Sequence, residues 1–335
     1  MLEFILTGTN PDGTFPIIGD CDNGRLHRLK VWENEDQEWN DFRYLLAAGA
    51  ILFQRTDFAQ VSGDQLDEAV WFFGKKALTF SEVQGNIGYL PIQLPSKIYP
   101  EGGLCILRHK DLQIVIDAGR NGQNGNGGHA HNDLLSFELF ADNHPWIIDP
   151  GTFVYTADYD ARQRFRSTAF HNVLQVDGAE QIPQIASQPF YLPTDPAVRV
   201  IEWLPGASFD RFTAEHDAYL RLPIPAIHRR EFVLDKPGRV LVIHDSLIST
   251  SPHILRSWLH FHPQITLEPS KANAVRVRWK GLSEVDCQVK WKADGVSELE
   301  TGQSSLSTSY GKYQVAPYLT LNTQGTWIEM IITFT

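Results

Sequence analysis

The spacing of apolar residues changes along the chain, and the change separates a helical beginning from a strand-rich remainder. Between Gln37 and Gln54 the apolar side chains recur at helical spacing, which predicts an amphipathic helix. A second helix is predicted from Ser62 to Leu78, with Asp64 as its cap. The apolar positions of the two helices are Trp39, Phe42, Leu45, Leu46, Ala50, Leu52, Leu66, Ala69, Val70 and Phe73. These helices need a partner surface to bury so many apolar side chains.

From about Tyr99 the pattern changes to period two, in short runs separated by Gly, Pro, Asn or Asp. The clearest runs are Leu104–Arg108, Leu112–Asp117, Glu231–Asp235, Val240–Asp245, Ser257–His262, Ala274–Trp279 and Trp327–Thr333. Many short strands predict a mainly β protein built as a large antiparallel β-sandwich. We therefore expect a helical segment over residues 1–80, a linker over 81–95 and a sandwich domain over 96–335. The segment Asp20–Gly24 has the residues of a turn.

Composition narrows the choice of partners. The 335 residues are 42% hydrophobic and carry a formal net charge of −11, which argues against a nucleic-acid footprint. An acidic chain can still bind an acidic glycan through a local basic groove. No apolar run is long enough for a membrane span. The three cysteines are too scattered for a disulfide framework, and the first residues do not have the pattern of a signal peptide.

The densest candidate chemistry lies between Gly127 and His171. His129 and His131 alternate at the start of an apolar, strand-like run, Asp149 closes the next run, and His171 opens a third. If the first run is a strand, both histidines point to one face. Zinc prefers imidazole nitrogen and carboxylate oxygen, so three of these residues could share an ion. The alternative is a set of buried polar residues that satisfy loop backbone groups.

Two further motifs are candidates for ligand contact. The loop over residues 121–128 is rich in glycine but has no lysine, so it does not match a phosphate loop. Its glycines either let a bulky ligand approach the backbone, with Asn126 as a polar contact, or form a plain flexible turn. Arg162, Arg164 and Arg166 could bind carboxylates or sulfates of a substrate, or could pair with nearby acids.

At these residues the chain resembles the C-terminal half of the heparinase II/III-like polysaccharide lyases. The similarity runs from about Thr9 to the end of the chain. It is carried by Gly128–Leu139, Ile148–Thr152, Phe165–Val173, Val176–Gly178, His228–Val233 and Val242–Asp245. The resemblance implies an α/α toroid of helical hairpins before the β-sandwich. Residues 10–78 resemble only the last hairpins, so we expect an N-terminally truncated member or a fragment.

The resemblance also implies a reaction, β-elimination on a uronic-acid polysaccharide of the alginate or heparin type. It places His129 among the catalytic residues, and it places His131, Asp149 and His171 on a structural zinc ion. Asn126, Arg162 and Arg166 are the expected substrate contacts. The family's catalytic tyrosine and an Asn or His come from the toroid, upstream of this chain. A periplasmic or extracellular location and a homodimer are further expectations.

Two other functions compete with the lyase. The first is a non-catalytic module, a sandwich that binds acidic glycans or serves a structural role. The second is a zinc hydrolase in which His129, His131, Asp149 and His171 all lie near one metal. The hydrolase is less well supported because Glu138 faces away from His129 and His131 if all three lie on one strand.

Overall fold

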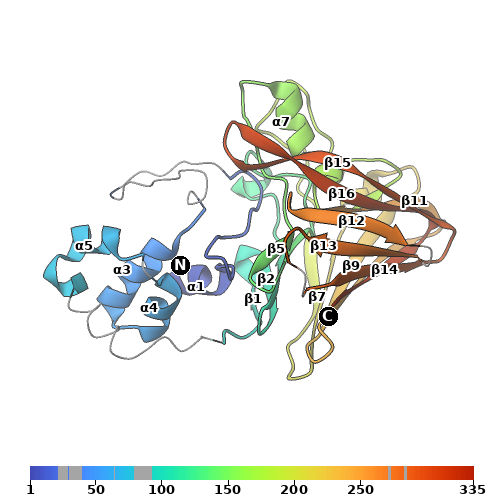
Figure 1. Cartoon of the computed structure of the whole chain (residues 1–335). Coiled ribbons are helices and arrows are strands. Elements are labelled where there is room, and N and C mark those ends of the chain that lie inside the picture. The colour runs from blue at the N-terminus through green and yellow to red at the C-terminus, as the bar shows by residue number, and fades with distance from the viewer. Residues whose placement is uncertain (22–28, 30–39, 64, 79–92, 271–272, 283–284) are drawn as a thin grey trace. The chain divides into compact units, whose positions relative to one another are not determined.

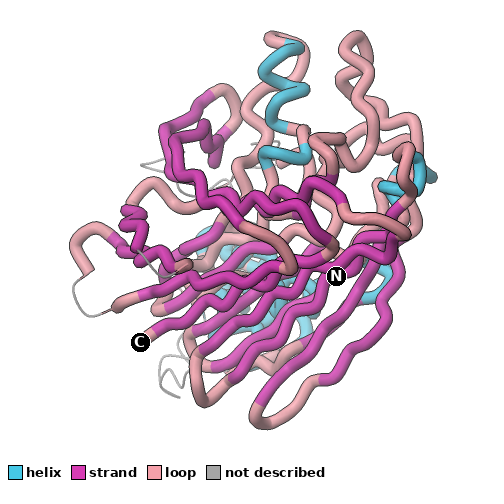
Figure 2. The backbone as a smooth tube through the Cα atoms, turned by 90° about the vertical axis from the view of Figure 1, so that its right-hand side faces the viewer, coloured by secondary structure: helices cyan, strands magenta, loops and turns pink. Residues whose placement is uncertain are grey.

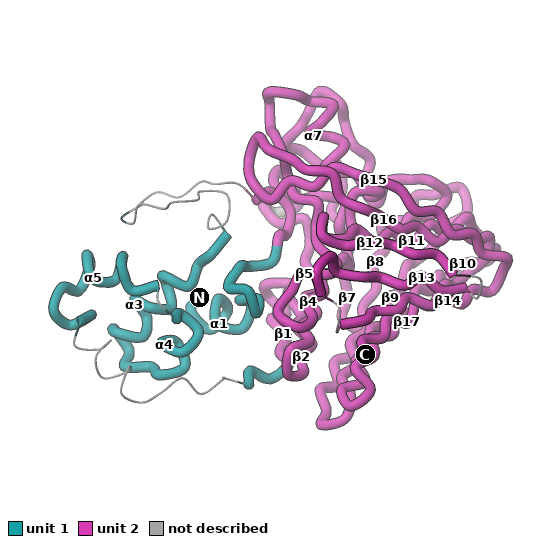
Figure 3. Tube along the Cα trace, viewed as in Figure 1, with its two compact units in different colours: residues 1–16, 22–95 teal, residues 17–21, 96–335 magenta. Residues whose placement is uncertain are grey.

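The computed structural model describes all residues except 22–28, 30–39, 64, 79–92, 271–272 and 283–284 (Figure 1). It divides the chain into two compact units (Figure 3). The first comprises Met1–Pro16 and Asp22–Pro95, and the second comprises Ile17–Cys21 and Ser96–Thr335. The short segment Ile17–Cys21 therefore belongs structurally to the second unit, although its neighbours in sequence on both sides belong to the first. The expected linker over 81–95 lies mostly outside the described residues.

The first unit is a small helical body organised around one helix. Its helices are α1 (Leu2–Gly8), α3 (Arg43–Phe53), α4 (Thr56–Ser62) and α5 (Asp67–Phe73). The helix α3 buries Leu46 and Ala50 in a cluster with residues of α1 and α4. It buries Ala47 and Ile51 in a second cluster with α5. The two sides of α3 thus hold the other helices by apolar burial.

Both predicted helical stretches contain helices, but these are shorter than predicted. Gln54 ends α3 in the left-handed conformation, with its N–H bonded to the carbonyl of Ala50. In the second stretch α5 ends at a turn at Gly74 and residues 75–78 are again helical, while Asp64, the predicted cap, lies outside the described residues. Leu52 is 59% exposed, so it does not belong to the buried face of α3. None of the described helices has the length and apolarity that a membrane crossing needs.

The second unit is built from three antiparallel sheets, which confirms the mainly β sandwich class (Figure 1). The five-stranded sheet has the order β1 (Lys97–Tyr99), β2 (Leu104–His109), β3 (Leu112–Asp117), β4 (Phe137–Ala141) and β5 (His144–Ile147). The eight-stranded sheet has the order β12 (Ile265–Ser270), β13 (Ala274–Trp279), β14 (Cys287–Ala293), β17 (Trp327–Phe334), β10 (Val240–Ser249), β9 (Ala226–Asp235), β8 (Phe209–His216) and β7 (Val198–Leu204). The four-stranded sheet has the order β15 (Ser297–Ser309), β16 (Lys312–Gly325), β11 (His253–His260) and β6 (Leu174–Val176).

One apolar core joins the three sheets, because each contributes buried side chains to it. Strand β9 shows the reason in its sequence, since buried and half-buried residues alternate along it. Trp146, Phe212 and Leu259 are examples of core residues from the three sheets. Figure 2 shows the long strands running alongside one another and the loops gathered at one end with a short helix. The predicted strand Ala274–Trp279 matches β13 in both bounds.

The loops of the second unit carry short helices as well as the candidate chemistry. The helix α7 (Tyr159–Phe165) begins after Asp158, whose side chain accepts a hydrogen bond from the N–H of Ala161. The 3-10 turns are η1 (Pro100–Gly102), η2 (Gln123–Gly125), η3 (Thr168–Phe170) and η4 (Ala218–Arg221). The connections between β3 and β4 and between β5 and β6 contain the histidines and arginines predicted from the sequence.

Candidate functional site

His129 and His131 lie in the loop before β4, which corrects the strand assumed for them. The strand begins only at Phe137, because Ser136 closes a turn onto the carbonyl of Asp133. The alternation of side chains along a strand therefore does not set the directions of these histidines relative to Glu138. Glu138 lies in β4 and accepts a hydrogen bond from the N–H of Ile17 at 3.1 Å.

A segment far away in sequence completes the loop. The N–H of Asp20 donates to the carbonyl of His129 at 2.8 Å, and the N–H of Cys21 donates to Oγ1 of Thr152 at 2.8 Å. Gly19 has a φ of 57°, and a Cβ there would lie 2.5 Å from the carbonyl oxygen of His129. A glycine is therefore required for this close approach. The segment Ile17–Cys21 is held edge to edge against the histidine loop.

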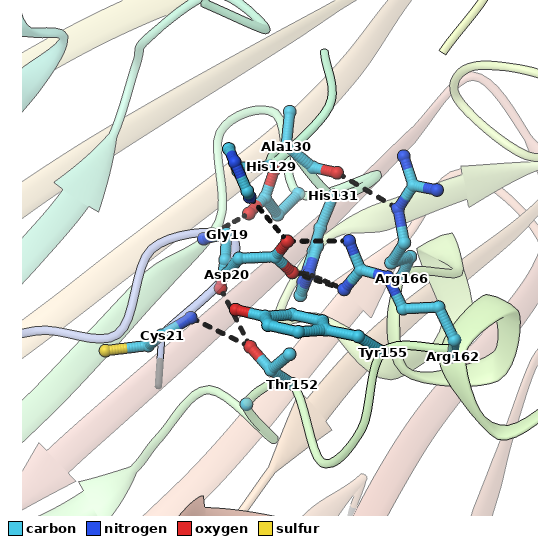
Figure 4. Close-up of polar contacts among 12 residues, drawn as sticks. Gly19, Asp20, Cys21, His129, Ala130, His131, Thr152, Tyr155, Arg162 and Arg166 are labelled. Carbon is cyan, nitrogen blue, oxygen red and sulfur yellow. Dashed lines mark hydrogen bonds and ion pairs between the residues drawn. The ribbon is translucent and has the colours of Figure 1, made fainter. Parts of the chain in front are cut away.

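Asp20 brings the two histidines and an arginine onto one carboxylate (Figure 4). Its Oδ2 lies 3.0 Å from Nδ1 of His129, and its Oδ1 lies 2.8 Å from Nε2 of His131. Arg162 donates from Nη2 to Oδ2 at 2.7 Å and from Nη1 to Oδ1. Burial alone would raise the pKa of Asp20, but the hydrogen bond from His131 and the charge of Arg162 outweigh it and lower that pKa.

The carboxylate contacts determine which nitrogens of the two histidines remain open. An ionised carboxylate only accepts, so Nδ1 of His129 and Nε2 of His131 are assigned as the protonated nitrogens. Arg162 Nη1 also lies 3.2 Å from that Nε2, and both groups share the same acceptor, Asp20. With these tautomers, Nε2 of His129 and Nδ1 of His131 carry the lone pairs.

A second pair, His171 and Asp149, lies next to His131. Nδ1 of His171 is 2.7 Å from Oδ2 of Asp149, and the rings of His131 and His171 have centroids 5.2 Å apart. Burial lowers the pKa of His171, but the nearby charge of Asp149 and its hydrogen bond outweigh this and raise it. The imidazole of His171 therefore has its Nε2 turned away from Asp149.

The atoms around His131 and His171 fit a metal ion. Nδ1 of His131 and Nε2 of His171 are buried and have no hydrogen-bond partner among the described residues. One ligand atom from each of His131, Asp133 and His171 lies within 4.8 Å of the others, and all three residues are buried. Two imidazole nitrogens and a carboxylate oxygen are ligands that zinc prefers. Asp149 bonds to the other ring nitrogen of His171, Nδ1. This arrangement is common around metal-bound imidazoles.

The predicted substrate contacts divide into buried and exposed residues. Arg162 and Arg166 are both fully buried, and Arg166 donates to the carbonyls of Ala130, Pro189 and Gly127. These contacts favour a role in holding the loops, so substrate contact by the two arginines stays a prediction. Asn126 is exposed, with weak hydrogen bonds from its amide to Gln123 and to the carbonyl of Phe190.

His129 is the exposed member of the cluster. Its side chain is 61% exposed, whereas that of His131 is 0% exposed. Aromatic rings border it, with the ring of Phe190 at 6.1 Å in an edge contact. The guanidinium of Arg162 lies over the rings of Tyr155 and Phe190, at 5.3 and 5.4 Å. A reacting molecule can therefore reach His129 but not the groups that hold it.

Sequence reasoning missed Asp20 and Asp133. Asp20 was interpreted as part of a turn, and it lies 109 residues before His129. Nothing in the local sequence links the two, because their contact depends on the return of a segment to the second unit. Asp133 stands two residues after His131 and could have been considered, since its carboxylate is a zinc ligand type.

The comparisons with known proteins agree with this architecture. The family described as heparinase II/III-like, C-terminal, matches residues 91–325. A solved structure described as a heparinase III gene product superimposes with a TM-score of 0.73 at 16% identity, covering 100% of this chain and 46% of its own. Heparan sulfate lyase HepC from Pedobacter heparinus gives a TM-score of 0.70 at 17% identity, with 98% and 45% covered.

These structural similarities, at such low identity, show the fold. The chain spans less than half the length of either solved structure. A search of curated protein sequences finds no match. The family match covers most of the chain, including the loops that carry His129, His131, Arg162 and His171. The chain therefore belongs to the heparinase II/III-like family and contains its C-terminal domain.

Proposed function

We propose that this chain is the C-terminal part of a polysaccharide lyase that cleaves a uronic-acid polysaccharide by β-elimination. The observation that carries the proposal is the exposed imidazole of His129, held at Nδ1 by a buried carboxylate while Nε2 keeps its lone pair. Such an imidazole suits proton transfer, because its exposed nitrogen can accept a proton from a molecule bound beside it. Membership in a lyase family supports this reaction over other uses of the same geometry.

In this reaction the proton on C5 of the uronate is removed and the glycosidic oxygen leaves. Nε2 of His129 would accept that proton or assist in neutralising the uronate carboxylate, and Nδ1–H would remain bonded to Asp20. Asn126, exposed beside the histidine loop, is the proposed polar contact to substrate. The acid that protonates the leaving oxygen is expected from the part of the longer relatives that this chain does not span.

We also propose a structural zinc ion held by His131, Asp133 and His171, with Asp149 orienting His171. The support is the pair of unpartnered buried nitrogens beside a buried carboxylate. A divalent cation there would neutralise charge and hold the two loops together, without contact to substrate. His131→Ala is expected to lose the metal, measured by elemental analysis of purified protein. His253→Ala, at a buried histidine bonded to Asp177, is the matched control and should retain it.

The substrate is proposed to be a heparin- or heparan-type polysaccharide, because a solved structure with this fold is a heparan sulfate lyase. Alginate is the second choice. Both polymers carry uronate carboxylates, which the reaction requires. A periplasmic or extracellular location and a homodimer complete the proposal.

The test is a lyase screen on the chain. It is mixed with heparan sulfate, heparin, alginate and hyaluronan, and the ultraviolet absorbance of new unsaturated uronate is followed. The expected result is a slow increase, because the chain does not span the part expected to supply the acid. His129→Ala should abolish this increase, and His244→Ala, at a half-exposed histidine on β10, should retain it. An equal increase in His129→Ala would contradict the assigned role.

A binding module is the alternative that the partial coverage of longer relatives favours. It predicts retention on immobilised heparin without any product. Metal-dependent depolymerisation without an unsaturated product would instead indicate a hydrolase. Both outcomes would reject the lyase proposal for this chain.

A further inference from the structure

We infer that Asp20 is the positioning residue of His129, which it holds as the Nδ1–H tautomer with Nε2 directed outward. This inference deepens the proposed function and rests on it for the role of His129. Asp20 itself is beyond the reach of a substrate, because its side chain is only 2% exposed. It would act through His129 alone.

Asp20 holds His129 at two points. Its backbone N–H donates to the carbonyl of His129 at 2.8 Å, and its Oδ2 accepts from Nδ1 of the same residue at 3.0 Å. Asp20 therefore fixes both the main chain and the ring of His129. A histidine in a loop with a 61% exposed side chain would otherwise sample several rotamers.

Asp20 is itself held in place by several hydrogen bonds. Its two carboxylate oxygens accept from Arg162, and that guanidinium is fully buried and also donates to the carbonyl of Pro189. His131 bonds to Oδ1 from the other side at 2.8 Å. Ordered, charge-assisted hydrogen bonds of this kind fix a carboxylate in one orientation.

The contact with Asp20 also determines which nitrogen of His129 can react. A carboxylate at Nδ1 only accepts hydrogen bonds, so it keeps the proton on Nδ1 and the lone pair on Nε2. The same carboxylate receives Nε2–H of His131, whose Nδ1 points to the proposed metal position. Asp20 thus links the residue proposed for proton transfer to the residue proposed for metal binding. If Asp20 served only to neutralise the charge of Arg162, its carboxylate would need no contact with either histidine.

The first experiment measures the tautomer and needs no substrate. Long-range nitrogen–proton NMR of the folded chain should show His129 protonated at Nδ1 and unprotonated at Nε2. Asp20→Asn removes the charge at nearly constant shape, and it should shift His129 toward the Nε2–H form. Asp177→Asn is the matched control, because Asp177 bonds to Nδ1 of His253 at 2.7 Å elsewhere in the unit. It should alter the signal of His253 and leave that of His129 unchanged.

The second experiment uses whichever polymer yields product. Asp20→Asn should lower kcat by about 100-fold or more while KM changes little, because substrate binding does not involve the buried carboxylate. Asp177→Asn should leave both constants unchanged.

The outcomes separate the two proposals. His129 in the Nε2–H form in the unmodified chain, or Nδ1–H retained in folded Asp20→Asn, would overturn the inference even if the lyase is active. If the chain shows the expected tautomer but forms no product, Asp20 still positions His129. The lyase proposal is then rejected. A fall in kcat matched by the same fall in Asp177→Asn would also overturn the inference, since it would reflect general loss of structure.

Discussion

Two clusters in the second unit contain the same residue types but differ in what they leave open. The loop cluster consists of Asp20, His129, His131 and Arg162. It holds one carboxylate against two imidazoles and a guanidinium. One of its histidines is exposed, and the other has a buried nitrogen without a partner among the described residues.

The sandwich cluster consists of His216, His228, Arg230 and Asp245, all fully buried on β8, β9 and β10. The N–H of Ala218 donates to Nδ1 of His216, whose Nε2 lies 3.0 Å from Nδ1 of His228. Nε2 of His228 lies 2.7 Å from Asp245, and Arg230 donates to both oxygens of the same carboxylate. In this cluster each histidine nitrogen has a partner. Residue types alone therefore do not distinguish a candidate site from a structural cluster. The exposed and unpartnered nitrogens of the loop cluster do distinguish it.

The sandwich cluster also holds the loops that carry the candidate site. Arg230 donates from Nη1 to the carbonyls of Leu135 and Asn172. Leu135 has a φ of 62°, an unfavourable conformation for a bulky residue, and Asn172 follows His171 directly. The amide of Asn172 donates to the carbonyls of Phe137, the first residue of β4, and Ile148, which follows β5. The buried ion pair therefore holds the loops that present the candidate site.

The largest expected effect comes from breaking the sandwich cluster. Asp245→Asn leaves the buried charge of Arg230 without its partner, which should lower the free energy of unfolding by about 3–5 kcal/mol. Urea denaturation followed by tryptophan fluorescence measures this. Asp286→Asn, at an exposed ion pair with Arg276, is the control and should change stability little. Equal, small losses in both variants would show that the buried pair does not hold the core.

The next effect concerns the metal site proposed beside the loop cluster. Asp133→Asn should abolish zinc binding, because it removes a charged ligand. Asp149→Asn should weaken binding by about 10–100-fold, because Asp149 orients His171 through Nδ1. Competition with a zinc chelator measures both affinities, with Asp177→Asn as the unaffected control. Complete loss in Asp149→Asn with retention in Asp133→Asn would instead make Asp149 the ligand, as the family resemblance implies.

The fold was largely predictable from the sequence because strand periodicity is a local property. Alternation along β9, β10 and β13 is visible in the residues themselves, and the structure places strands there. The apolar run after His131 was extended too far back into the loop, because alternating polar residues in a turn resemble a strand edge. The hydrogen bond that ends the turn, from Ser136 to Asp133, has no signature in the pattern.

The candidate site was only partly predictable, since its members come from distant segments. His129 and His131 were found because they share one motif. Asp20 was not, because its pairing with them depends on a segment separated from them by the first unit's helices in sequence. The arginines were found as a cluster, but their burial could not be predicted, because it depends on carbonyl groups of a loop that the pattern did not place.

The smallest effect is a pH dependence that separates the two clusters. Burial, together with the charges of His228 and Arg230, holds the pKa of His216 well below its usual value. The unfolded chain then binds a proton that the folded chain does not, so stability falls as the pH decreases below about 6.5. His216→Gln should reduce the slope of stability against pH by up to about 1.4 kcal/mol per pH unit between pH 6 and about 5. Urea titrations of both proteins across this range measure the difference.

Urea denaturation at one fixed pH compares the two clusters directly. His129→Gln should lower the free energy of unfolding less than His216→Gln does, because the side chain of His129 is largely in water and that of His216 is fully buried. If the two substitutions destabilised the chain equally, His129 would be packed into the fold as firmly as a core histidine. The distinction between a closed cluster and an open one would then fail. If only His216→Gln destabilises the chain, the exposed histidine contributes little to stability.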